Sequence, residues 1–276
     1  MAGLSMSWAR IMAPVAGGDA DAALLDAARA IAEPFEAELA AVYAPADVAD
    51  LMPWMGEGFM GGVQVTAVQS LKEAAAEGER AARAACEAVG YGRKSFTALS
   101  SPVWSALSME GRLSDVVVFD DGAAKGRGPL AESFQQIVAD EQRPTIVARQ
   151  GLSVGGVVAV AWDGGKEASR AARTALPLLQ RASRVVILAA PASSARYFDP
   201  VRLQGFFQVR GIAADVQSLS ESGDPGGGLI RAAKEAGANL LVAGAFGHPR
   251  LQEYIFGGTT RAFMNATEAP SLFLSH

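Results

Sequence analysis

One order of strands and helices occurs twice in this chain of 276 residues. An apolar run that ends before Gly17 has a counterpart that ends before Gly164, which lies 147 positions later. Near the ends of the two repeats, Pro270 follows Pro144 by only 126 positions. The shorter second spacing places an extra loop in the first half, at residues 45–63. The chain is therefore predicted to be a tandem repeat of one β/α unit.

Short apolar runs bounded by turn residues predict strands, and apolar residues three and four positions apart predict helices. The expected strands cover residues 11–15, 39–43, 96–99, 115–119, 145–148, 157–162, 185–189, 215–219, 240–243 and 271–274. The expected helices cover about residues 20–33, 69–89, 168–179 (with a kink at Pro177), 197–208 and 228–236, and one begins near Arg261. Strands that alternate with helices of this length form a parallel sheet covered on both faces.

The repeat predicts two α/β domains, residues 1–150 and 151–276, with a boundary near residues 151–156. We expect them to be related by a pseudo-twofold axis and to pack together through their last strands. Each last strand is short and apolar, and an open edge of that kind would invite aggregation.

The charge distribution argues against nucleic acid and anionic membranes as partners. The net charge is −5 and no cluster of Lys and Arg is present. Cys86 is the only cysteine, so an internal disulfide or a cysteine-based metal cluster is impossible. No signal-peptide pattern opens the sequence, and the longest apolar runs are too short to span a membrane. We expect a soluble cytoplasmic protein.

The stretch from Gly244 to Thr260 is the strongest candidate for a ligand site. It follows the expected strand at residues 240–243 and leads into a helix. Glycines let backbone N–H groups approach a ligand, and a Gly-Gly-Thr-Thr helix start offers free donors and hydroxyls that suit a phosphate. A strand–loop–helix turn with glycine caps explains the same residues without a ligand.

With these residues in place, the chain resembles the universal stress protein family in its tandem form. The family's signature is Gly, two residues, Gly, nine residues, then Gly followed by Ser or Thr, and Gly244, Gly247 and Gly257 match it. The closing stretch 269–275 and the Asp163-Gly164 turn also look like the family. The resemblance is strong over residues 155–276 and weaker over residues 1–150.

The resemblance implies five-stranded parallel sheets of strand order 3-2-1-4-5, with a ligand crevice where strands 1 and 4 diverge. It implies binding of an adenine nucleotide, ATP or AMP, with or without Mg²⁺, for stress response or signalling. The implied nucleotide-binding residues are Asp163, Gly244, Gly247, Gly257, Gly258, Thr259 and Thr260. Gly258 departs from the family, which has Ser or Thr at this position, so one hydroxyl that would face a phosphate is missing.

The first half departs further from the signature. Alignment of the fourth strands puts Asp120 and Ala123 where Gly244 and Gly247 lie, and alignment of the fifth strands puts Ala131 at Gly257. A carboxylate in place of a phosphate-binding glycine repels the ligand. The first half is thus expected to be a structural partner that makes an internal pseudo-dimer.

Other motifs carry less weight. Residues 56–61 match the dinucleotide fingerprint but lack its strand–turn–helix context, so a loop that covers a surface or a second chain is favoured. His248 and Arg250 could contact a phosphate or lie in solvent. Asp120-Asp121 could suggest a metal, but no third ligand accompanies them, so a solvated loop is favoured.

Three functions compete for this sequence. The first is a nucleotide-binding stress protein with at most slow ATP hydrolysis, and the second is a scaffold that binds no nucleotide. The third, a nucleotidyl transferase or ATP pyrophosphatase, requires a catalytic lysine, histidine motif or metal carboxylates, and the sequence shows no catalytic residues at the crevice. The nucleotide-binding protein is favoured, with a homo-oligomer left open.

Overall fold

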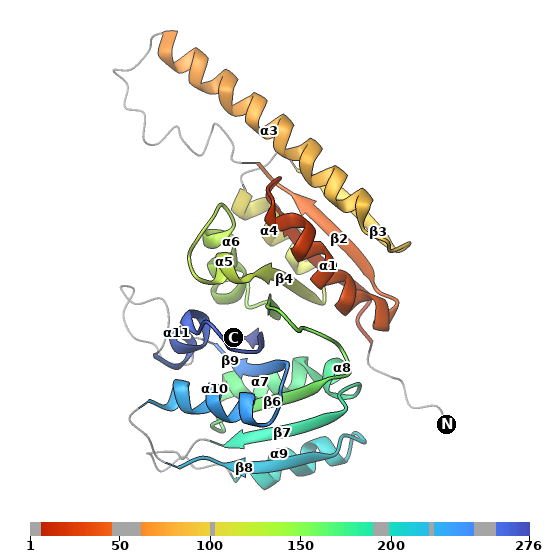
Figure 1. Cartoon of the computed structure of the whole chain (residues 1–276), viewed down its shortest axis with the longest axis vertical. Coiled ribbons are helices and arrows are strands. Elements are labelled where there is room, and N and C mark those ends of the chain that lie inside the picture. The colour runs from red at the N-terminus through yellow and green to blue at the C-terminus, as the bar shows by residue number, and fades with distance from the viewer. Residues whose placement is uncertain (1–6, 46–61, 100–102, 190–198, 221–223, 246–257) are drawn as a thin grey trace.

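The computed structural model describes residues 7–45, 62–99, 103–189, 199–220, 224–245 and 258–276 (Figure 1). Its ten strands are β1 (Arg10–Val15), β2 (Glu38–Tyr43), β3 (Lys94–Ala98), β4 (Val116–Asp120), β5 (Thr145–Ala148), β6 (Val157–Trp162), β7 (Arg184–Ala189), β8 (Ala214–Ser218), β9 (Leu240–Gly244) and β10 (Ser271–Ser275). They form one sheet of order β3-β2-β1-β4-β5-β10-β9-β6-β7-β8.

Each half contributes five parallel strands in the order 3-2-1-4-5, as the family resemblance implied. The central strands are buried on both faces, which explains their continuous apolar sequences, such as Val-Val-Val-Phe in β4. The edge strands β3 and β8 contain Lys94 and Asp215 and are only partly buried. Charged edges of this kind oppose further strand pairing.

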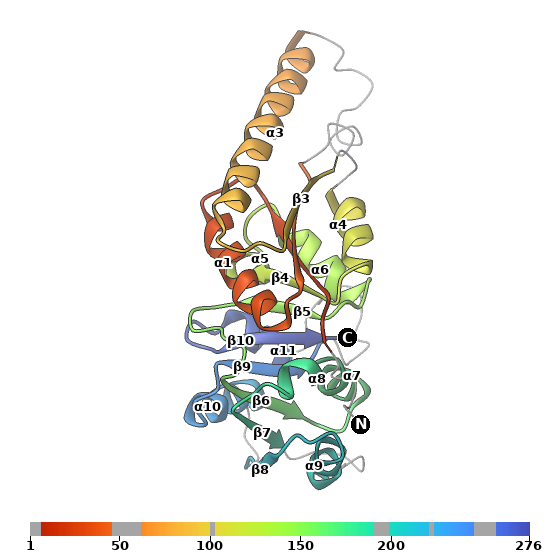
Figure 2. The same ribbon diagram turned by 90° about the vertical axis from the view of Figure 1, so that its right-hand side faces the viewer.

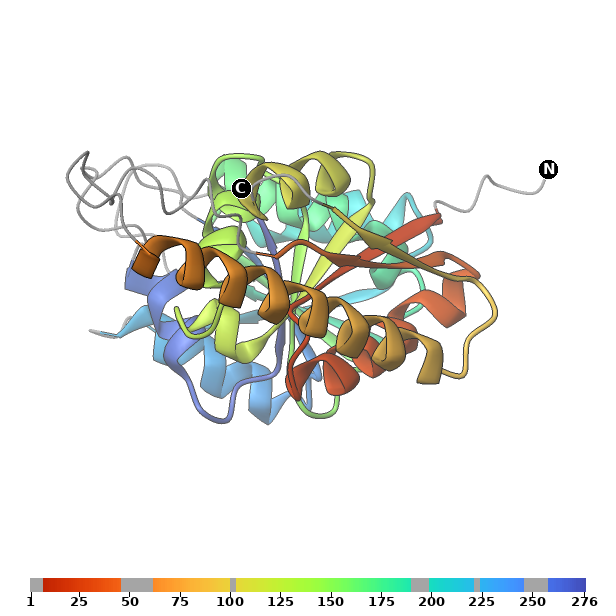
Figure 3. The ribbon, with the colours of Figure 1, turned by 90° about the horizontal axis from the view of Figure 1, so that it is seen from above.

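The two halves meet through their last strands, as predicted, and the contact is direct antiparallel pairing of β5 with β10. Ile146 pairs with Phe273, and Val147 pairs with Leu272. The second residue of each strand thus faces the third residue of the other, which is what a twofold axis between the strands requires. The halves therefore build one mixed ten-stranded sheet, and its twist is visible from above (Figure 3).

Helices cover both faces of the sheet. The first half has α1 (Ala20–Ala32), the 3-10 helix η1 (Glu33–Phe35), α3 (Gly62–Ala88), α4 (Val103–Arg112), α5 (Asp121–Ala124) and α6 (Ala131–Ala139). The second half has α7 (Lys166–Thr174), α8 (Leu176–Leu179), α9 (Pro200–Gln208), α10 (Pro225–Glu235) and α11 (Gly258–Asn265). Side chains of α1, α3, α7, α8 and α9 join one core, and those of α4, α5, α6, α10 and α11 join the other.

Aromatic side chains reinforce the junction between the halves. Trp8 stacks on Phe273 with ring centroids 6.2 Å apart, and it also contacts Phe35 at 5.0 Å. From the second half, the guanidinium of Arg181 lies 4.1 Å from the Phe35 ring centroid. These contacts bury apolar surface from both halves, so the halves share a core across their junction.

The helix α3 extends past the sheet at the end of the molecule opposite β8 (Figures 1 and 2). It begins at Gly62, seven residues before its expected start, and directly follows residues 46–61. The loop expected at residues 45–63 and its dinucleotide-like motif lie almost wholly outside the described residues.

Candidate functional site

The candidate crevice lies at the carboxyl ends of β6 and β9, which are neighbours in the sheet. After β6 the chain enters α7 on one face, and after β9 it reaches α11 on the other face. Chain segments that leave adjacent strands for opposite faces open a crevice between them. This is the switch point that the strand order predicted.

Asp163 directly follows β6 and is exposed at the mouth of this crevice. Its Oδ1 accepts a hydrogen bond of 2.8 Å from the N–H of Gly165, the N-cap of α7. The turn depends on Gly164, whose φ of 74° lies in the left-handed region. The second carboxylate oxygen of Asp163 has no hydrogen bond within the described part of the chain.

Gly244, the last residue of β9, lies where the α7 helix begins. A Cβ atom at this position would come within 2.6 Å of the backbone nitrogen of Ala168 and the carbonyl carbon of Glu167. A glycine is therefore required for the first turn of α7 to pack on β9. This close packing accounts for Gly244 without any ligand, so a role in ligand binding rests on the sequence motif.

The helix α11 begins at Gly258, three residues before the expected start at Arg261. The expectation was wrong because Gly-Gly-Thr-Thr has low helix propensity, while Phe263 and Met264 anchor the helix in the core. Gly258 is exposed, and a Cβ atom added to it would meet no described atom within 4 Å. Among the described residues, none would block a side chain at this position.

The two threonines of the motif differ in exposure. Thr259 is half-buried, whereas Thr260 is only 5% exposed. Both lie in the first turn of α11, where backbone N–H groups have no partner within the helix. Gly226 of α10 lies against this turn, since a Cβ there would be 3.4 Å from the Thr259 Cα. Thr259 and the helix start are thus better placed than Thr260 to meet a ligand.

Four residues of the sequence motif, Gly247, His248, Arg250 and Gly257, lie outside the described residues. Arg261 is described and is exposed. The structure therefore brings Asp163 and Gly244 to neighbouring strand ends and places Gly258, Thr259 and Thr260 together at one helix start.

The corresponding crevice of the first half holds carboxylates of the chain itself. Asp21 is 3% exposed and accepts hydrogen bonds from the backbone N–H groups of Ala16 and Gly17, at 3.0 and 2.8 Å. Asp120, at the position of Gly244, accepts a hydrogen bond of 2.7 Å from Ala123 and caps α5. Asp21 was not predicted as a site residue. Its only signal in the sequence is that a carboxylate lies four residues after Gly17.

The helix α3 also lies over the first half's crevice. Gly17 has a φ of 76°, and a Cβ atom there would overlap the backbone of Gly78 in α3. The hydroxyl of Tyr43, at the end of β2, donates a hydrogen bond of 2.9 Å to the Ala75 carbonyl. Gly17, in the turn after β1, and Gly78, in α3, lack a Cβ atom, and this allows α3 to pass over the carboxyl ends of β1 and β2.

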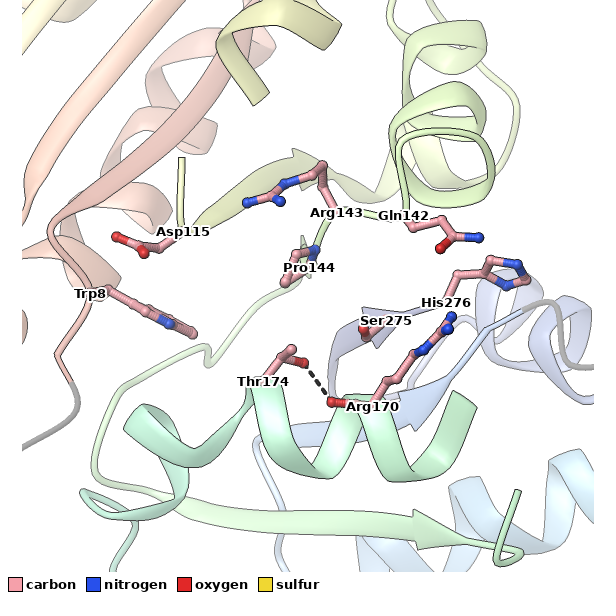
Figure 4. A pocket seen from close by; sticks show the side chains of 9 residues that line it. All are labelled: Trp8, Asp115, Gln142, Arg143, Pro144, Arg170, Thr174, Ser275 and His276. Carbon is pink, nitrogen blue, oxygen red and sulfur yellow. Dashed lines mark hydrogen bonds between the residues drawn. The ribbon is translucent and has the colours of Figure 1, made fainter. Parts of the chain in front are cut away.

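A pocket of about 420 Å³ lies between the halves, and no motif pointed to it (Figure 4). Its walls include Trp8, Asp115 and Arg143 from the first half and Arg170, Thr174 and His276 from the second. Asp115 accepts hydrogen bonds from the N–H groups of Ala9 and Arg10, and Arg143 donates to the Ser114 carbonyl. These hydrogen bonds join segments of the first half to one another.

The described ranges contain neither a candidate metal site nor a candidate membrane-spanning helix. There, no three His, Cys, Asp or Glu residues are grouped closely enough to hold a metal ion. No helix in these ranges combines the length and the apolar character needed to cross a membrane.

Comparison with known proteins shows a family match in the second half and a similar fold over the whole chain. The model of the universal stress protein family matches residues 156–274, whereas the curated proteins give no match. A universal stress protein from Archaeoglobus fulgidus DSM 4304 has a TM-score of 0.64 and 12% identity, covering 96% of this chain and 95% of its own. A functionally unknown protein from Pseudomonas aeruginosa PAO1 has a TM-score of 0.55 and 13% identity, covering 97% and 92%. The chain thus has the fold of these structures over its whole length, and its residues 156–274 match the universal stress protein family.

Proposed function

We propose that this protein binds one adenine nucleotide, ATP or AMP, in the crevice of its second half and none in its first. The proposal is carried by the contrast between the two crevices. In the first half, Asp21 and Asp120 accept hydrogen bonds from backbone N–H groups at the carboxyl ends of β1 and β4. In the second half, the position that corresponds to Asp21 by the 147-residue spacing is Ala168, whose side chain has no acceptor to offer.

The phosphates would lie at the start of α11. Its first residues are Gly258, Thr259 and Thr260, which offer N–H groups without a partner among the described residues, a half-buried hydroxyl and the positive end of the helix dipole. The dipole contributes about 0.3–1 kcal/mol toward an anion, and hydrogen bonds to charged phosphate oxygens add more. Asp163, at the end of β6, would receive the hydroxyl groups of the nucleoside.

The test is a charge placed at the start of α11. Gly258→Asp fits the open space at this position and favours the helix, because a carboxylate near a helix N-terminus is stabilising. The same carboxylate repels a phosphate, so calorimetric titration should show ATP affinity reduced by at least about tenfold. The matched control is Ala131→Asp at the start of α6, which should leave the affinity unchanged.

Equal losses in both variants would contradict a site restricted to the second half. If the unmodified protein bound neither ATP nor AMP, the nucleotide proposal would fail. The scaffold function would then be favoured, and the close packing of β9 on α7 would be the whole reason for the glycine at position 244.

A further inference from the structure

Arg149 reaches from the first half into the second. It follows β5, and its side chain is only 7% exposed. On the side of the first half, its Nε donates a hydrogen bond of 2.7 Å to Oδ1 of Asp121, the first residue of α5. Lys125 also forms an ion pair with Asp121, at 2.5 Å. The guanidinium is thus anchored on its own half.

The remaining donors of Arg149 hold the end of α11. Nη2 donates to the carbonyls of Phe263 and Met264, at 2.9 and 3.2 Å, and Nη1 donates to the Pro270 carbonyl at 3.0 Å. The last carbonyls of a helix have no partner within it, and a cation there also favours the helix dipole. Arg149 therefore satisfies the C-terminal end of the helix whose N-terminal end carries Gly258 and Thr259.

Within the described residues, only the first half makes a contact of this kind with the other half. The pseudo-twofold axis that exchanges Ile146 with Leu272 also relates Arg149 to Ser275. A serine is too short to reach a helix end across the junction, and Ser275 instead borders the pocket between the halves. The first half thus holds α11 of the second half, and Ser275 offers no equivalent hold on α6.

We propose that Arg149 is a positioning residue for the nucleotide site, through which the first half fixes the direction of α11. This inference rests on the proposed function for its effect on affinity. The helix has eight residues, so its two ends belong to one rigid rod about 12 Å long. Loss of the hold at Met264 lets the rod tilt and moves the N–H groups at Gly258 away from the phosphates.

The test compares three variants. Arg149→Met keeps much of the side chain's volume but removes its charge and donors, whereas Arg149→Lys keeps the charge and loses the planar fork. Asp121 keeps Lys125 as a partner in both, so its half-buried carboxylate is not left unpaired. The matched control is Arg112→Met, since Arg112 donates two hydrogen bonds to Glu141 within the first half and does not touch α11.

Two quantities are measured on the full chain. Calorimetry should show ATP affinity reduced about tenfold in Arg149→Met, partly restored in Arg149→Lys and unchanged in Arg112→Met. Amide hydrogen exchange without nucleotide should accelerate in residues 258–265 of Arg149→Met, while β6 and β7 keep their protection.

The exchange measurement separates this inference from the nucleotide proposal. The titration can show that neither the unmodified protein nor any variant binds ATP. In that case, faster exchange confined to α11 of Arg149→Met still supports Arg149 as the residue that holds this helix. Unchanged exchange in α11, or an equal increase throughout the second half, would overturn the inference. So would full ATP affinity in Arg149→Met.

Discussion

Single carboxylates decide how the two crevices differ. In the first half, Asp21 gives Ala16 and Gly17 the acceptor that a ligand phosphate would otherwise supply. A buried carboxylate that accepts backbone N–H bonds is a fixed internal anion, and a second anion beside it is repelled. Asp21 thus stabilises the turn after β1, and under the proposed function it also keeps a phosphate out of this crevice.

Removal of this carboxylate should destabilise the protein. Asp21→Ala leaves two partly buried N–H groups without an acceptor, which costs about 2–3 kcal/mol in the free energy of unfolding. Urea denaturation measures this loss. Asp19→Ala is the control, because Asp19 is exposed and its side chain caps no helix, so its effect should stay within about 0.5 kcal/mol. Similar losses in the two variants would contradict the role given to Asp21.

Asp121 links stability to pH. Burial by itself raises its pKa, but hydrogen bonds from Lys125 and Arg149 outweigh burial and hold the pKa below the usual value. A carboxyl group whose folded pKa is depressed contributes stability that is present above its unfolded pKa, about 4, and lost as pH falls through the folded pKa. The stability difference between the unmodified protein and Asp121→Asn should therefore be largest near pH 7. It should shrink below about pH 4, and a difference that grew on acidification would contradict the assignment.

At the level of elements, strands were predicted more accurately than helices. Residues 145–148 and 157–162 were expected as strands and form β5 and β6 with the same bounds. Buried parallel strands appear as short continuous apolar runs, which local sequence displays directly. The predicted break at Pro177 is confirmed, because α7 ends at Thr174 and α8 starts at Leu176.

Helices that depend on tertiary contacts were not predicted from the sequence. The helix α4 was not expected, although its Ala106 and Leu107 are buried in the core. Asp120 and Asp121 were interpreted as a solvated loop, yet one caps α5 and the other binds Arg149. The partners of Arg149 in α11, Phe263 and Met264, lie more than 100 positions away, and no local pattern encodes such a contact.

The proposed nucleotide site places the phosphates at the start of α11. Gly258→Ser places a hydroxyl in open space at the position where the family pattern has Ser or Thr. A hydrogen bond from this hydroxyl to a charged phosphate contributes about 1–2 kcal/mol, so ATP affinity should rise roughly fivefold or more in calorimetry. Gly205→Ser in α9 is the control, since it also replaces an unhindered helical glycine but lies in another helix. An equal rise in both variants would assign the effect to helix stability alone.

At the scale of the whole molecule, the continuous sheet makes the halves depend on each other. Leu272, Phe273 and Leu274 of β10 are fully buried, and β5 of the first half covers the edge of this strand. A fragment of residues 151–276 would expose that edge. Because β5 and β10 are related by a twofold axis, a second copy of β10 can replace β5. Light scattering should show the fragment as a dimer, and a stable monomer would contradict the junction's role.

The central claim is that the second half alone binds a nucleotide. Native mass spectrometry of the full chain with ATP counts the nucleotides that each chain retains. We predict one ATP in the unmodified protein and in Ala131→Asp, and a clearly lower ATP occupancy in Gly258→Asp at the same ATP concentration. Two nucleotides per chain, or none in the unmodified protein, would contradict the account.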